Sequence, residues 1–220
     1  MRLTAGQGEM SCRSLKSALV TLIGLAAPLA SLAGPVGGSW VADAEVQQRL
    51  AGGEVVVRAA TASDADGSRG RVRAAVLIKA EPKAIWAVLI DCREALKFVP
   101  GLKLCRRIDG APDGRWQEIE QEIHYSWVLP SVRNVLRADC VPPQRIDFHR
   151  ISGDLKQEDG TWLLEPTADG SATVVEYEMY LDPGFWIPQW LVTRTLRRDL
   201  PAALSGLRER VEHPSKAGPA

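Results

Sequence analysis

The sequence predicts an α+β fold in which a curved antiparallel β-sheet wraps around a long C-terminal α-helix, with two short helices after the first strands. Residues 102–181 alternate apolar and polar side chains in short segments that turn pairs separate. The last thirty or so residues carry an apolar stripe at helical spacing. Because a long amphipathic helix must cover an apolar surface, we expect it to lie on the inner face of the sheet.

The N-terminal half of this domain combines two strands and two short helices. Residues 54–60 and 72–80 have Val-rich strand patterns, and the polar residues 61–70 between them are expected to form a loop. Pro82 can occupy a first helical position without losing a hydrogen bond, so it predicts the start of a helix. A second short helix is expected to end before Pro100-Gly101.

Six further strands are predicted as an antiparallel meander. The strongest hairpin signals are the turn pairs Asp109-Gly110, Asp113-Gly114, Asp159-Gly160 and Asp169-Gly170. We expect strands at residues 102–108, 116–125, 132–140, 145–151, 160–165 and 173–181.

Strand alternation predicts which side chains face the helix. In residues 116–125, Glu118, Glu120, Glu122 and His124 share the outer face. Acid-base catalysis there is less favoured than a solvated face, on which Arg133 and Arg137 of the next strand pair with the glutamates. The inner face is predicted to hold Ile119, Gln121, Ile123, Tyr125, Leu136, Ala138, Cys140, Ile146, Phe148, Trp162, Leu164, Val175, Tyr177 and Met179.

The C-terminal helix follows a segment rich in Trp and Pro. Pro201 lacks a backbone N–H and is expected to bend the helix or loosen its first half. Two readings are open for the preceding Trp186 and Trp190, which form either a lid over the core or an entrance that touches lipid. The apolar stripe comprises Val192, Leu196, Leu200, Ala203, Leu204, Leu207 and Val211.

The N-terminus has the pattern of an export signal. Arg2, Arg13 and Lys16 precede a 13-residue apolar stretch, and Ser31-Leu32-Ala33 matches a cleavage site. We expect residues 1–33 to be a signal peptide and the protein to be periplasmic or secreted, with an uncleaved anchor as the alternative. Residues 34–53 are expected to be an N-terminal extension, in which Asp43 caps a short helix, and residues 214–220 a flexible tail.

Composition and motif content narrow the function. The 220 residues include 27 basic and 27 acidic side chains, which argues against a nucleic-acid partner. No nucleophile elbow, phosphate-binding loop, dinucleotide fingerprint or zinc-protease motif occurs in the sequence. We therefore predict no catalytic residue, metal site or cofactor.

Three cysteines follow the predicted signal. Cys92 and Cys105 flank a short Pro-Gly turn and can form a disulfide in an oxidising compartment, although free thiols are not excluded by the sequence. Cys140 lies in an apolar strand and is expected to be a buried small hydrophobe.

Three segments resemble a known superfamily. Residues 80–89 (AEPKAIWAVL), 98–102 (FVPGL) and 160–166 (GTWLLEP) are similar to the START-like SRPBCC superfamily, in particular its polyketide cyclase/dehydrase and coenzyme Q-binding branch. The resemblance covers residues 72–211 and implies a helix-grip fold, which we assign to residues 54–213. It also implies an apolar cavity between the sheet and the last helix.

The leading hypothesis is an exported protein that binds a hydrophobic small molecule such as a lipid, isoprenoid or quinone, with transient membrane-surface contact. The alternatives are a cyclase/dehydrase-type enzyme that uses the same cavity and a protein-interaction module with a filled core. The candidate ligand-binding residues are Phe98, Gln121, Ile123, Tyr125, Trp127, Leu136, Phe148, Trp162, Tyr177, Met179, Trp186, Trp190 and Leu196.

Overall fold

The structure, a computed structural model, describes residues 40–64, 67–124 and 130–214. Tyr125 and Trp127 lie outside these residues, as does the predicted signal. The helical elements are η1 (Trp40–Ala42), α1 (Ala44–Ala51), α2 (Pro82–Leu89), α3 (Cys92–Phe98), α4 (Gln189–Arg194), η2 (Thr195–Asp199) and α5 (Leu200–Glu212). The strands are β1 (Val56–Asp64), β2 (Gly67–Ile78), β3 (Leu102–Gly110), β4 (Trp116–Ile123), β5 (Val132–Val141), β6 (Arg145–Gly153), β7 (Gln157–Pro166) and β8 (Thr173–Asp182).

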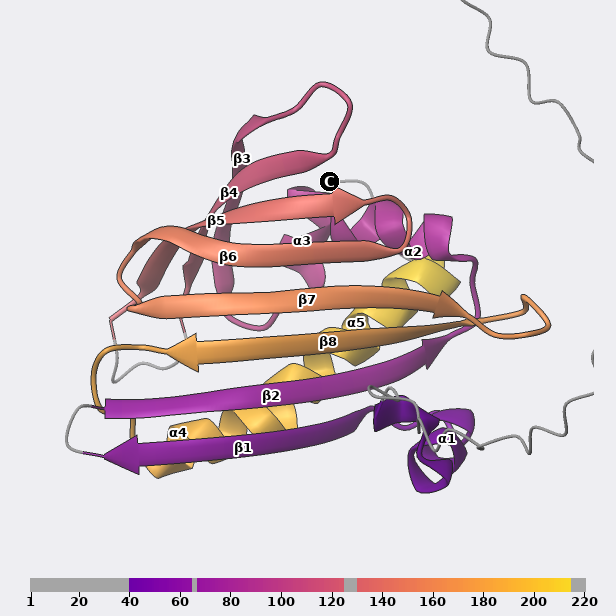
Figure 1. Ribbon diagram of the computed structural model, residues 1–220, viewed down its shortest axis with the longest axis horizontal. Helices are drawn as coiled ribbons and strands as arrows, with labels where there is room; N and C mark the ends of the chain where they lie inside the picture. Colours follow the sequence, from indigo (N-terminus) through magenta and orange to yellow (C-terminus); the bar gives the residue numbers. More distant parts are fainter. Residues whose placement is uncertain (1–39, 65–66, 125–129, 215–220) are drawn as a thin grey trace, which may run out of the picture. The chain divides into compact units, whose positions relative to one another are not determined.

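The eight strands form one curved, open antiparallel sheet in the order β1-β2-β8-β7-β6-β5-β4-β3. The segment from α4 to α5 crosses behind this sheet, and α2 and α3 pack beside α5 (Figure 1). The predicted helix-grip fold is therefore confirmed.

The first hairpin is longer than predicted. Residues 61–70 were expected to be a loop, but β1 and β2 pair along their whole length from Val56 and Ala75 to Asp64 and Gly67. The other edge of β2 pairs with β8 from Gly70 to Ile78. The β1–β2 ladder satisfies backbone groups of these polar residues, and the β2–β8 ladder holds the rest of β2 in the sheet, so strand pairing overrides the loop preference.

The Asp159-Gly160 pair does not form a turn. It lies inside β7, where Gly160 is opposite Phe148 on β6. A Cβ atom on Gly160 would lie 2.3 Å from Cζ of Phe148, so the ring occupies the space that a side chain would need. Gly160 is thus required by a contact between strands, which the local sequence does not reveal.

The C-terminal helix is interrupted as Pro201 predicts. The five residues of η2 form a π-helical turn between α4 and α5, and Pro201 lies in the first turn of α5. Leu204 and Leu207 of α5 are fully buried, while Leu200 and Ala203 are only partly buried. The first turn of α5 therefore covers the sheet less closely than the rest.

Side-chain alternation along β2 divides the core between the two faces of the sheet. Ala74, Val76 and Ile78 face α5, whereas Ala75 packs in a smaller cluster with Val46 and other residues of the N-terminal helix region. The predicted cap of α1 is present, since the Asp43 side chain accepts a hydrogen bond from the Glu45 N–H. The short N-terminal helix thus covers a corner of the sheet face opposite α5.

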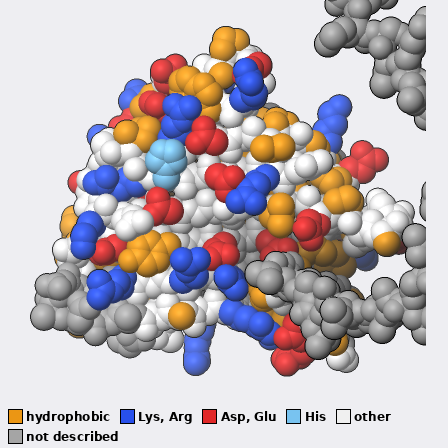
Figure 2. Space-filling model, in the orientation of Figure 1, with side chains coloured by type: hydrophobic (Ala, Val, Ile, Leu, Met, Phe, Trp, Pro, Cys, Tyr) orange, Lys and Arg blue, Asp and Glu red, His pale blue; other side chains and the backbone are white. Residues whose placement is uncertain are grey.

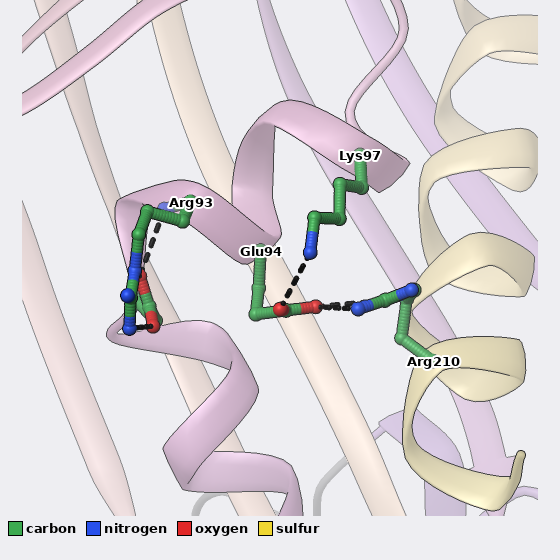
Figure 3. A network of polar contacts seen from close by, with 5 residues as sticks. Arg93, Glu94, Lys97 and Arg210 are labelled. Carbon is green, nitrogen blue, oxygen red and sulfur yellow. Dashed lines mark hydrogen bonds and ion pairs between the residues drawn. The ribbon is translucent and has the colours of Figure 1, made fainter. Parts of the chain in front are cut away.

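Two cross-links hold α3 in place. Cys92 at the start of α3 forms a disulfide with Cys105 of β3, with 5.1 Å between the Cα atoms. Glu94 accepts hydrogen bonds from Lys97, at 3.1 Å, and from Nε of Arg210 on α5, at 2.7 Å (Figure 3). Burial raises the pKa of Glu94, but the two cations outweigh burial and the pKa is lowered overall. The carboxylate therefore stays charged and ties α3 to α5.

No helix among the described residues is long and apolar enough to cross a membrane.

Cys140 on β5 is buried and is a free cysteine within the part of the chain that the structure describes, in agreement with its predicted role as a small core residue.

Candidate functional site

A cavity of about 310 Å³ lies between the inner face of the sheet and the helical layer. Its floor is formed by side chains of β4 to β8, and its other walls come from the α3–β3 turn, η2 and the first turn of α5. Apolar side chains dominate, among them Leu89, Phe98, Ile119, Leu136, Ala138, Ile146, Leu200, Ala203 and Leu204.

The alternation of side chains along the predicted strands identified much of this cavity wall. The predicted residues that line the cavity are Phe98, Gln121, Ile123, Leu136, Phe148, Trp162, Tyr177 and Met179. Of the other candidates, Tyr125, Trp127 and the side chain of Leu196 lie outside what the structure describes.

Trp186 and Trp190 do not line the cavity. Their side chains are on the surface, 65% and 50% exposed. Asp182 ends β8 and accepts a hydrogen bond at 2.9 Å from the Gly184 N–H, which forms a turn that directs the following residues away from the core. The reading of this segment as a lid folded onto the core is therefore wrong for these two rings.

An aromatic group forms one side of the cavity. The Trp162 and Tyr177 ring centroids are 4.4 Å apart with planes tilted by 41°, and Phe148 lies 6.1 Å from Tyr177. The Tyr177 hydroxyl donates to the sulfur of Met179 at 3.0 Å. Phe148 can lie flat over β7 because Gly160 has no side chain. The three rings thus offer a broad apolar surface to a ligand.

Glu158 is a buried carboxyl that the sequence interpretation missed. It lines the cavity and accepts a hydrogen bond at 2.9 Å from the Asn134 amide nitrogen on β5. The side-chain oxygen Oδ1 of Asn134 accepts in turn from the Leu155 backbone N–H at 3.2 Å. Burial raises the pKa of Glu158 to about 7, because desolvation outweighs the stabilising Asn134 hydrogen bond.

The sequence contained a signal for Glu158. Trp162 and Leu164 were correctly predicted to face inward, and the same alternation places Gly160 and Glu158 on that face. Because Asp159-Gly160 was taken as a turn pair, the predicted strand began at Gly160 instead of Gln157 and so left Glu158 outside the sheet.

His124 differs from its predicted position. It was assigned to the outer face with the glutamates of β4, but β4 ends at Ile123, and His124 borders the cavity. The backbone N–H of His124 donates to the Gly101 carbonyl at 2.8 Å, which fixes His124 beside the α3–β3 turn. Arg194 and Asp199, which also border the cavity, form an ion pair at 3.6 Å.

The outer face of the sheet carries paired charges. Glu122 binds Arg133 at 2.6 Å and Glu118 lies 3.8 Å from Arg137, so the predicted cross-strand pairing is confirmed. Figure 2 shows basic and acidic side chains next to each other on this face. An open hollow of about 480 Å³ there is lined largely by polar side chains such as Arg71, His149 and Asp159, and lacks the apolar wall of the inner cavity.

Among residues 40–64, 67–124 and 130–214, no group of three or more His, Cys, Asp or Glu side chains is arranged to hold a metal ion.

The chain matches a known protein family and is similar in fold to several solved structures. The family described as polyketide cyclase / dehydrase and lipid transport matches residues 78–208. No curated protein sequence matches the chain. An aromatase/cyclase from a Streptomyces species has the same fold at a TM-score of 0.56 and 15% identity, covering 69% of this chain and 99% of its own. A STAR-related lipid transfer protein fragment from Xanthomonas axonopodis gives a TM-score of 0.55 and 18% identity, covering 70% and 99%.

A START superfamily protein from Mycobacterium smegmatis is similar to the same degree. Its TM-score is 0.55 at 17% identity, with coverage of 66% of this chain and 99% of its own. At such identities these solved structures establish a common fold and leave the ligand to be argued from the cavity.

The raised pKa of Glu158 predicts a specific pH dependence of stability. Below a pH of about 4.5 the carboxyl is protonated in both the folded and the unfolded chain. As pH rises from there to about 7, the unfolded chain releases the proton while the folded chain retains it, so the free energy of unfolding falls. Glu158→Gln removes this contribution, which is on the order of 3 kcal/mol.

Urea unfolding of both proteins across this pH range measures the difference. Glu165→Gln, an exposed position on the same strand, is the control and should follow the original protein. Identical pH profiles for Glu158→Gln and the original protein would show that the carboxyl is not held in its neutral form.

Proposed function

Because the chain belongs to the polyketide cyclase/dehydrase and lipid transport family, we propose that it is a binding protein for a hydrophobic small molecule such as a lipid, isoprenoid or quinone. The observation that carries this proposal is the apolar cavity of about 310 Å³ between the sheet and α5. This volume lies within the range of small-molecule sites, which are typically concave and apolar with a few polar groups.

Burial of apolar surface is the main source of affinity in this proposal. A ligand that buries about 300 Å² of apolar surface gains on the order of 7 kcal/mol, before the cost of its immobilisation. The three rings of Phe148, Trp162 and Tyr177 contribute a large part of the contact area. Such a site needs no metal or nucleophile, and selects its ligand by shape and by a few polar contacts.

Filling the cavity should weaken ligand binding. Ala203 borders the cavity on α5, so Ala203→Phe places a ring in the ligand volume and should weaken binding by at least about tenfold. The measurement is the fluorescence of the neutral apolar probe N-phenyl-1-naphthylamine, which brightens when it leaves water.

The neighbouring Ala202 supplies a matched control. It lies on the same helix but is exposed, so Ala202→Phe adds the same side chain outside the cavity and should leave binding unchanged. If Ala203→Phe bound the probe as well as the original protein, or if the original protein did not bind it at all, the cavity would be excluded as the ligand site.

We further propose transient contact with a membrane surface through Phe185, Trp186 and Trp190. These side chains are exposed, and the exposed Arg197 and Arg198 follow in the same helical segment. Aromatic rings suit the interface between lipid and water, and arginines are attracted to anionic headgroups.

The double variant Trp186→Ala/Trp190→Ala should bind vesicles of phosphatidylglycerol and phosphatidylcholine about tenfold less tightly. Co-sedimentation with the vesicles measures this binding. Ile108→Ala, at another exposed apolar side chain on β3, serves as the control and should bind as the original protein does. Equal binding by all three proteins would refute the membrane contact.

Export from the cytoplasm is the third part of the proposal. The signal pattern of residues 1–33 favours it, and a Cys92–Cys105 disulfide suits an oxidising compartment. Protein expressed from the full chain should be recovered outside the cytoplasm with an N-terminus near Gly34. Thiol titration of that protein, unfolded without reductant, should detect one thiol, from Cys140. Cytoplasmic protein that retains residues 1–33 and has every thiol free would contradict export.

A further inference from the structure

Glu158 is a buried carboxyl in the largely apolar wall of the cavity, and this inference about it rests on the proposed function. The residue is 8% exposed and borders the cavity beside Phe148, Trp162 and Met179. A buried carboxyl costs free energy unless its polar atoms are hydrogen-bonded, so an oxygen of Glu158 that the protein leaves unpaired calls for a partner on the ligand.

The Asn134 amide determines which oxygen can meet a ligand. Its carbonyl oxygen is held by the Leu155 N–H, so its nitrogen points to Glu158 and donates to Oε2 at 2.9 Å. Within the described residues, Asn134 is the one side chain that donates to this carboxyl. Oε2 is therefore an acceptor that is already in use, and Oε1 is the oxygen available to the cavity.

Few charged groups surround Glu158, and they shift its pKa in opposite directions. Asp159 on the same strand raises its pKa and Arg150 of β6 lowers it, while Leu181 is its neighbour on β8. Asn134 of β5 is neutral, and the remaining charged or titratable groups that border the cavity are the Arg194–Asp199 pair, His124 and Tyr177. Burial has the largest effect of all, so the carboxyl holds its proton up to about neutral pH.

We propose that the protonated Glu158 carboxyl donates a hydrogen bond from Oε1 to a carbonyl oxygen of the bound ligand, so that the cavity prefers apolar ketones over hydrocarbons of the same shape. A ketone oxygen accepts a hydrogen bond and leaves no donor of its own to be satisfied. An alcohol would bring an O–H group that needs a further acceptor in an apolar wall. Asn134 acts as a positioning residue that holds Oε2 and so directs Oε1 to the ligand.

The test compares two probes of nearly the same shape, α-tetralone and tetralin, as competitors of N-phenyl-1-naphthylamine. The quantity measured is the ratio of their affinities, which cancels any general effect of pH on the cavity. In the original protein this ratio should favour tetralone about three- to tenfold more at about pH 5.5 than at about pH 8.5, because the ionised carboxyl cannot donate.

Two variants separate the hydrogen bond from other causes. Glu158→Gln keeps an N–H donor at the same place, so tetralone should keep its advantage and the ratio should lose its pH dependence. Glu158→Leu removes the donor and should lower the ratio about three- to tenfold at about pH 5.5. Glu165→Gln, exposed on the same strand, should behave as the original protein.

The outcomes distinguish this inference from the proposed function. If N-phenyl-1-naphthylamine binds but the ratio does not change with pH in the original protein, the role of Glu158 is refuted and the binding function stands. A ratio that still changes with pH in Glu158→Gln assigns the effect to another group and also refutes it. If neither the fluorescent probe nor tetralin binds, the proposed function itself fails. Should Glu158→Leu not fold, the pH profile of the original protein and Glu158→Gln decide the matter.

Discussion

The close contact between α5 and α3 is the constraint on which the cavity depends. A Cβ atom on Gly206 would lie 2.9 Å from Cβ of Phe98, so the two helices meet almost backbone to backbone at this point. The C-terminal part of α5 is also held by Arg210 on Glu94 and by Glu212, which accepts from the Lys79 N–H at 2.8 Å. Because this end is fixed against its neighbours, the first turn of α5 and η2 can stand away from the sheet and leave a cavity.

The same arrangement gives the two ends of the cavity different chemistry. The closely packed part of the helical layer contributes apolar side chains such as Leu204. Arg194 at the end of α4 and Asp199 of the π-helical turn lie at the border of the cavity, and Glu158 adds a buried carboxyl from the sheet side. A ligand in this cavity therefore gains affinity from burial along its length, whereas its polar atoms decide its orientation.

The periodicity of the sequence predicted the features of the fold that depend on local sequence. It failed where a contact between residues far apart in the sequence determines the structure. Alternation along the strands identified Leu136, Phe148, Trp162 and Tyr177 as inward-facing, and Pro201 marked the interruption of the last helix. Asp159-Gly160 has the sequence of a hairpin turn, but the Phe148 ring makes Gly160 part of a strand. That single error also hid Glu158, because a carboxyl is expected on the surface unless the strand that buries it is known. Trp186 and Trp190 were predicted to bind the ligand because they are apolar. In the structure they follow the turn after Asp182 and are exposed.

The exposed tryptophans and the cavity are parts of one continuous helical segment. Trp190 of α4 precedes Arg194 by four residues, which places the two side chains on the same face of the helix one turn apart. Arg194 borders the cavity and is paired with Asp199, so the segment that carries the aromatic surface also carries one wall of the site. The π-helical turn η2 lies between α4 and the anchored part of α5. The aromatic surface at Trp190 and the cavity border at Arg194 and Asp199 therefore belong to one segment, which leads directly into the part of α5 anchored by the buried Leu204 and Leu207 and by the close contact at Gly206.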